Sequence, residues 1–183
     1  MKRTTRLMAA ASVLVAAAGV GLTSASNAAA DGVALQTIIF EHLSGFEEDP
    51  LVFSTPGSAT FAAVIKDRDQ QIDYRLSWKD LPTNVAQSHI HLGGPSQSGG
   101  ISVFLCSNLG NGPAGTQACP AAGPGTVTGT IKPVDVIGPA AQGIAAGEFA
   151  ELVTAIRAGA TYVNVHTAER PGGEVRGQIE HGH

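Results

Sequence analysis

Hydrophobic and polar residues alternate along much of the chain, most clearly over residues 72–78. Every second side chain in this segment is apolar, from Ile72 to Trp78, and polar residues stand between them. A period of two over seven residues is typical of a half-buried β-strand. The apolar segment 61–65 precedes it and is separated from it by the polar residues 66–70. The two segments therefore predict a β-hairpin.

Further strands are expected wherever short apolar or alternating segments lie between turn residues. Glycine and proline dominate the joints at 93–95, 123–125 and 171–173. Short strands with regularly spaced turn signals indicate an all-β sandwich or barrel. The remaining expected strands are 34–43, 87–92, 101–106, 126–131, 161–167 and 174–180.

One segment, residues 148–158, departs from the strand pattern. Phe149, Leu152, Val153 and Ile156 follow the i, i+3, i+4, i+7 spacing of an amphipathic helix. Arg157 stands where a basic side chain favours the carboxyl end of a helix. We expect one short crossover helix near 148–158.

The first thirty residues have the pattern of a secretory signal peptide. Basic residues at positions 2, 3 and 6 precede the uncharged apolar segment 7–22, and three alanines at 28–30 offer a cleavage site. A retained membrane anchor is the alternative, but the apolar segment is short for a membrane span. We therefore expect a signal peptide at 1–30, a single domain at 31–183 and no membrane span after cleavage. The protein would be secreted or extracellular, or else periplasmic or associated with the cell envelope.

The charge balance narrows the class of partner. The chain has 11 basic and 15 acidic residues, and three of the basic ones lie within 1–30. Eight basic residues then remain against fifteen acidic ones, a formal charge of −7. Nucleic acids and anionic membranes favour clustered Lys and Arg. We expect neither as a partner, and an extracellular protein or surface ligand of unknown identity instead.

Cys106 and Cys119 are the only cysteines. An isolated pair in an exported protein is expected to form a disulfide bond. Closing a loop of this length stabilises the fold by about 3 kcal/mol in the chain-entropy model. Two free thiols or a thiolate metal site are the alternatives.

Three histidines on two expected strands offer the main candidate site. His89 and His91 are two positions apart, so on a strand they point to the same face. Asn164 and His166 share a face of the later strand for the same reason. If the two strands are neighbours, His89, His91 and His166 can bind one metal ion, with Glu174 as an oxygen ligand. Three imidazoles suit copper, zinc or iron better than calcium or magnesium.

A purely structural role for these residues is the competing interpretation. Histidines beside Gly/Pro turns can hydrogen-bond backbone carbonyls, and Glu174 and Arg176 can form an ion pair that stabilises the turn at 171–173. The acidic run 47–49 is read as a solvated loop. There is no Gly-x-Ser-x-Gly motif, and a disulfide would remove both thiols, so the sequence offers no nucleophile and no catalytic residue.

Four segments of the chain resemble the CHRD domain, first recognised in chordin and also found singly in secreted bacterial proteins. They are the segments that begin His42-Leu-Ser-Gly, Ser88-His-Ile-His, Tyr162-Val-Asn-Val-His and Pro171-Gly-Gly-Glu-Val-Arg. The resemblance implies a Greek-key β-sandwich of the immunoglobulin or superoxide dismutase type. It implies no known reaction, because a fold alone does not carry an activity.

Two functions follow as hypotheses. The first is a secreted, non-enzymatic binding or structural module, in which Asn164 and Arg176 belong to a polar network. The alternative is a mononuclear copper or zinc protein, and it could be redox-active. It would use His89, His91 and His166.

Overall fold

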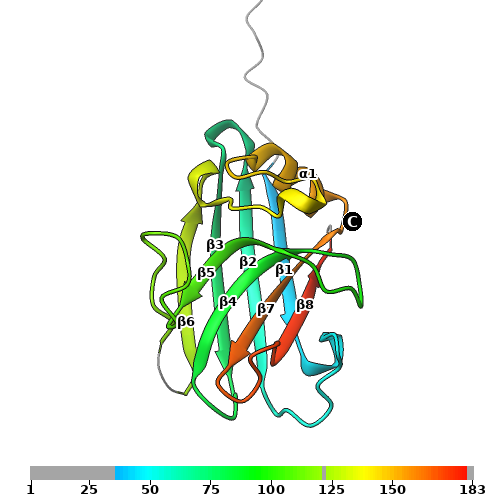
Figure 1. Cartoon of the computed structure of the whole chain (residues 1–183), viewed down its shortest axis with the longest axis vertical. Coiled ribbons are helices and arrows are strands. Elements are labelled where there is room, and N and C mark those ends of the chain that lie inside the picture. The colour runs from blue at the N-terminus through cyan, green and yellow to red at the C-terminus, as the bar shows by residue number, and fades with distance from the viewer. Residues whose placement is uncertain (1–35, 121–122, 181–183) are drawn as a thin grey trace, which may run out of the picture. The chain divides into compact units, whose positions relative to one another are not determined.

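The structure, a computed structural model, describes residues 36–120 and 123–180. The expected signal peptide at 1–30 lies outside the described residues. The described residues form two antiparallel sheets (Figure 1). One sheet has the order β1 (Thr37–Leu43), β2 (Ser58–Lys66), β3 (Gln71–Lys79), β6 (Gly125–Ile131). The other has the order β5 (Ile101–Ser107), β4 (Val85–Leu92), β7 (Thr161–Thr167), β8 (Val175–Ile179).

The chain crosses between the sheets in a Greek-key manner. Strand β6 returns to lie beside β3, and β7 returns to lie beside β4. The connection between β6 and β7 contains α1 (Phe149–Arg157), the short helix expected near 148–158. Single 3₁₀ turns occur at η1 (Gly45–Glu47), η2 (Asp67–Asp69), η3 (Pro133–Asp135) and η4 (Ala140–Gln142). The predicted all-β sandwich is confirmed.

Alternation explains how the strands build the core. Alternate residues of β2 and β3 are buried, as the period of two predicts. The apolar side chains of both sheets meet between them, and the apolar stripe of α1 is buried too. The core therefore includes Leu76 of one sheet and Ile90 and Val163 of the other.

The second sheet also has buried side chains on the face opposite the core, and there they are polar. His89, Asn164 and Arg176 are buried although their strand neighbours Ile90 and Val163 point into the core. Loops at the sheet edges cover these polar side chains. A backbone bridge between Ser44 and Arg176 brings in the segment after β1. This covered outer face of the second sheet holds the candidate site.

The predicted disulfide bond joins Cys106 at the end of β5 to Cys119 and closes the loop between them. Asn108 within that loop donates its side-chain amide to the carbonyl of Cys119. The loop is therefore secured by a covalent bond and a hydrogen bond. Among the described residues, no helix combines the length and apolar character that a membrane crossing requires.

Candidate metal centre

The three candidate histidines lie together because β4 and β7 are neighbours. In their antiparallel register His89 pairs with Asn164, and Gln87 pairs with His166. The strand pairing that the sequence left open is therefore present. The three side chains lie on the outer face of the sheet and are almost fully buried, with exposed fractions of 1% for His89, 8% for His91 and 6% for His166.

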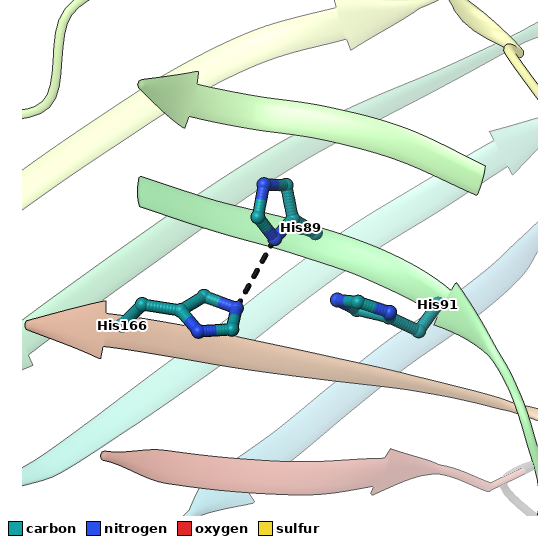
Figure 2. Close-up of side chains that lie close together, drawn as sticks. All are labelled: His89, His91 and His166. Carbon is teal, nitrogen blue, oxygen red and sulfur yellow. Dashed lines mark hydrogen bonds between the residues drawn. The ribbon is translucent and has the colours of Figure 1, made fainter. Parts of the chain in front are cut away.

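The imidazole rings converge on one point, as Figure 2 shows. One ring nitrogen of each histidine lies within 4.8 Å of the other two. The closest pair is the Nδ1 atom of His89 and the Nε2 atom of His166, 3.1 Å apart. His89 and His91 meet edge to face, with ring centroids 5.2 Å apart.

Backbone carbonyls fix the proton position on two of the rings. The Nδ1 atom of His166 lies 2.9 Å from the carbonyl oxygen of Pro171. The Nδ1 atom of His91 lies 2.9 Å from that of Gly99. A carbonyl only accepts, so in each ring Nδ1 carries the proton and Nε2 keeps its lone pair. Such outer hydrogen bonds orient metal-binding histidines.

His89 presents its Nδ1 atom to the other two rings. Because Nε2 of His166 is an acceptor, Nδ1 of His89 donates to it across the 3.1 Å contact. The Nε2 atoms of His89 and His91 are buried and have no hydrogen-bond partner among the described residues. Unpaired buried nitrogens are costly, and a ligand that accepts the lone pair of Nε2 of His91 would remove part of that cost.

Burial keeps all three rings neutral at physiological pH. Burial, together with the neighbouring His166 and His91, lowers the pKa of His89 to about 2. Burial also lowers the pKa of His166 to about 4, against the opposing effect of the Pro171 carbonyl. The pKa of His91 is lowered mainly by burial. Neutral imidazole is the form that binds a metal ion.

The geometry fits a single transition-metal ion. Imidazole nitrogens bind zinc at about 2.0–2.1 Å, so two ligands of one ion can be at most about 4 Å apart. The His89–His166 separation of 3.1 Å lies within this limit. The other separations are at most 4.8 Å, and any that exceeds about 4 Å would have to shorten for all three rings to bind one ion.

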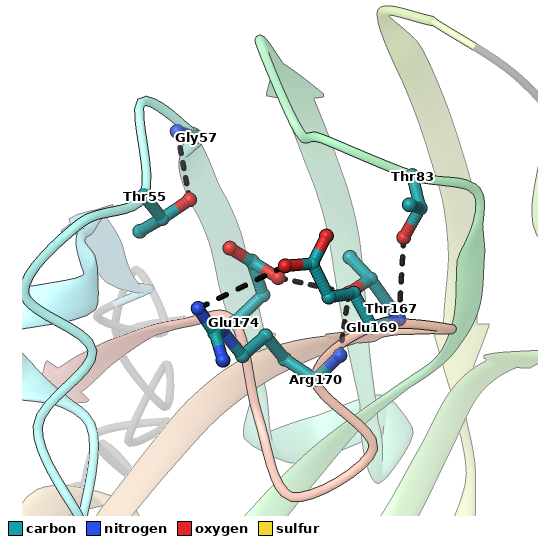
Figure 3. Close-up of polar contacts among 7 residues, drawn as sticks. All are labelled: Thr55, Gly57, Thr83, Thr167, Glu169, Arg170 and Glu174. Atoms are coloured by element: carbon teal, nitrogen blue, oxygen red, sulfur yellow. Dashed lines mark hydrogen bonds and ion pairs between the residues drawn. The ribbon is translucent and has the colours of Figure 1, made fainter.

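Glu174, the expected oxygen ligand, has a different position. Among the described residues, the convergent group consists of the three histidines without Glu174. Oε2 of Glu174 accepts a hydrogen bond from the Thr167 hydroxyl at 2.8 Å. The Thr167 oxygen in turn accepts the backbone N–H of Arg170 (Figure 3). Glu174 therefore stabilises the turn between β7 and β8.

Arg176 holds a loop and makes no ion pair with Glu174 among the described residues. Its guanidinium donates to the carbonyl oxygens of Gly94 at 2.7 Å and Gln97 at 3.1 Å. It also lies 3.5 Å from the centroid of the Tyr162 ring. Arg176 thus fixes the β4–β5 loop, whose Gly99 carbonyl orients His91. The Asn164 side chain lies on the same face, and its buried Oδ1 atom has no hydrogen-bond partner within the described part of the chain.

Sequence reasoning missed two contributors to this face. Tyr162 stacks on His91, with ring centroids 4.8 Å apart and an interplanar angle of 5°. It stands two positions before Asn164, so the same alternation could have identified it. Glu48 was read as part of a solvated run, yet it is buried beside this face. Its burial depends on how η1 folds back, which no local pattern indicates.

Comparisons with known proteins agree with the resemblance seen in the sequence. A family model described as the CHRD domain matches residues 40–179. No curated protein and no solved structure gives a significant match. The matched residues include all three histidines, Glu174 and Arg176.

Proposed function

Because the chain belongs to the CHRD domain family, we propose that it is a metal-binding form of this module that holds one copper or zinc ion. The ligands would be His89, His91 and His166. The observation that carries the proposal is the convergence of three neutral, buried imidazoles within 4.8 Å of one another.

The donor atoms argue for the kind of metal. Three nitrogen ligands favour copper or zinc, whereas calcium and magnesium require shells of oxygen. Three protein ligands also leave one position of a tetrahedral ion for water or a small molecule. Copper bound in this way would exchange one electron, so the proposal extends to redox activity at the same site.

Export is part of the same proposal. The disulfide bond between Cys106 and Cys119 supports an oxidising compartment. The expected signal peptide at 1–30 points to the same destination. The formal charge of −7 for the remaining chain supports a protein or surface ligand as partner, in place of nucleic acid.

A metal-free binding or structural module is the second candidate. It is favoured by the Arg176 network, which ties Gly94 and Gln97 to the sheet through hydrogen bonds that need no ion. In this case the histidines would act only as partners of the Gly99 and Pro171 carbonyls.

Metal analysis separates the two candidates. Mature protein without an affinity tag would be dialysed against zinc or copper and its metal content measured by mass spectrometry. We expect one ion per chain, and loss of that ion in His89→Ala and His166→Ala. His42→Ala is the matched control, because His42 is an exposed histidine on β1. Folded protein with far less than one ion per chain would favour the metal-free module.

A further inference from the structure

A second candidate site lies on the other side of the β7–β8 turn. A cavity of about 450 Å³ separates this turn from the segment after η1. This volume is within the range of small-molecule sites. Its walls include the acidic residues Glu48, Asp49 and Glu169, one basic residue, Arg170, and the apolar residues Leu51 and Phe53. Phe53 is 76% exposed, so solvent reaches the cavity.

Glu48 is the unusual member of this cavity. Only 7% of it is exposed, and its Oε1 atom is buried without a hydrogen-bond partner among the described residues. The carboxylate lies directly against Gly173, where an added Cβ atom would be 2.4 Å from one oxygen and 2.5 Å from the other. Burial raises the pKa of Glu48 to about 7. A buried carboxylate needs a counter-charge to ionise without this cost.

The described residues give Glu48 no direct counter-ion. The charge of Arg176 lowers the pKa of Glu48, but the guanidinium is hydrogen-bonded to Gly94, Gln97 and Gln178. No ion pair within 36–120 and 123–180 includes Glu48 or Glu174. The cavity walls carry three carboxylates and one guanidinium, that of Arg170, which lies 3.9 Å from Glu169. An added monovalent cation beside Glu48 would offset part of this excess negative charge.

The chemistry of the walls indicates an organic cation in preference to a metal ion. Among the described residues, the histidine group of the candidate metal centre is the only set of three convergent metal-ligand atoms. Calcium and magnesium need six or more oxygen ligands. Leu51 and Phe53 instead offer apolar surface beside the carboxylate. A cation with an aliphatic chain would use both the charge and the apolar wall.

From this arrangement we infer that the cavity binds an alkylammonium group, with Glu48 as its counter-ion and Leu51 and Phe53 against its alkyl chain. The group could come from a free amine or from a lysine side chain of a partner protein. Because His89, His91 and His166 do not line the cavity, this inference stands apart from the metal proposal.

The test uses the mature protein in the presence of a chelator, so that metal binding cannot affect the result. n-Butylammonium chloride is titrated at pH 8 while the amide resonances of Gly172 and Gly173 are followed by NMR. Butanol and sodium butyrate serve as neutral and anionic probes of the same length. We expect saturable shifts with n-butylammonium and at least tenfold weaker binding of butanol and butyrate. Equal shifts with butanol would overturn the inference, and this comparison requires no variant.

Substitution of the proposed counter-ion gives a second measurement. Glu48→Gln should weaken n-butylammonium binding at least tenfold, because it keeps the shape and removes the charge. Glu151→Gln, which removes an exposed charge on α1, is the matched control and should bind as the wild type does. Unchanged affinity in folded Glu48→Gln would contradict the inference. Tighter binding of an end-blocked Gly-Lys-Gly peptide would point to a lysine of a partner, and equal binding to a free amine.

Discussion

The Nδ1 atom of His89 lies 3.1 Å from the Nε2 atom of His166, although 77 positions separate the two residues in the chain. Both rings are neutral, so one proton is shared along this contact in the metal-free protein. A metal ion that bound both nitrogens would replace this hydrogen bond and move the His89 proton to Nε2. The proposed site therefore needs no net loss of a proton from these two rings near neutral pH.

Metal affinity should consequently change little between pH 8 and pH 6. Two histidines with an ordinary pKa near 6.5 would lose roughly 15-fold in affinity over this range, because protons would compete with the ion. The pKa values of about 2 for His89 and about 4 for His166 remove this competition. We expect less than a threefold change in zinc affinity, measured by competition with a chelator whose own pH dependence is known. A loss of tenfold or more would show that the rings protonate readily.

Gly173 should tolerate no larger residue. A Cβ atom there would lie 2.4 Å from the Glu48 carboxylate, and the φ angle of +139° favours glycine. We expect Gly173→Ala to lower the free energy of unfolding by about 2–3 kcal/mol, measured by chemical denaturation.

The neighbouring Gly172 provides the control. Nothing lies within 4 Å of the Cβ position at Gly172. Gly172→Ala should therefore change stability by less than about 1 kcal/mol. Equal effects of the two substitutions would contradict the packing of Glu48 against Gly173.

Arg176→Lys should destabilise the protein although it keeps the charge. Lysine cannot reproduce the two guanidinium donors that reach Gly94 and Gln97, so one or more of these acceptors would lose its bond. We expect a loss of about 2 kcal/mol and faster hydrogen exchange in residues 93–99. The exposed Arg75 of β3 gives the matched control, since Arg75→Lys should change neither the stability nor the hydrogen exchange of residues 93–99. Unchanged exchange in the loop would show that Arg176 does not hold it.

The stability of the protein should depend on pH through Glu48. Its pKa is raised from 4.5 to about 7 in the folded protein, so the folded state holds this proton more tightly than the unfolded state. The resulting stabilisation is fully present below pH 4.5 and is lost as the pH rises towards 7. The shift corresponds to at most about 3 kcal/mol. Glu48→Gln should therefore gain stability relative to the wild type from pH 4.5 to 7, in matched denaturation curves. If the difference in free energy of unfolding between Glu48→Gln and the wild type stayed constant over this pH range, the buried position of the Glu48 carboxyl would be contradicted.

The sequence was sufficient for the fold because strand alternation is a local property. The pattern from Ile72 to Trp78 identifies β3, and Phe149, Leu152, Val153 and Ile156 identify α1. Burial of alternate side chains then follows from the geometry of a strand. Sheet order is not local, and here the resemblance to a known family supplied the Greek-key sandwich.

The candidate site was only partly foreseeable for a related reason. Spacing placed His89 and His91 on one face, and the pairing of β4 with β7 added His166. Glu174 was expected beside them because it shares a face with Arg176 on the expected strand 174–180, but its carboxylate accepts a hydrogen bond from Thr167 within the turn. Glu48 was missed because a charge run before a proline is usually solvated. Its burial follows from a backbone path that only the tertiary structure defines.

The most direct test of the metal proposal is a crystal structure of the mature protein grown with zinc, with anomalous scattering measured at the zinc absorption edge. The proposal predicts one anomalous peak at about 2.0–2.1 Å from Nδ1 of His89, Nε2 of His91 and Nε2 of His166. The hydrogen bonds from His91 to Gly99 and from His166 to Pro171 should persist. Zinc bound elsewhere, or no anomalous peak between the three rings, would contradict it.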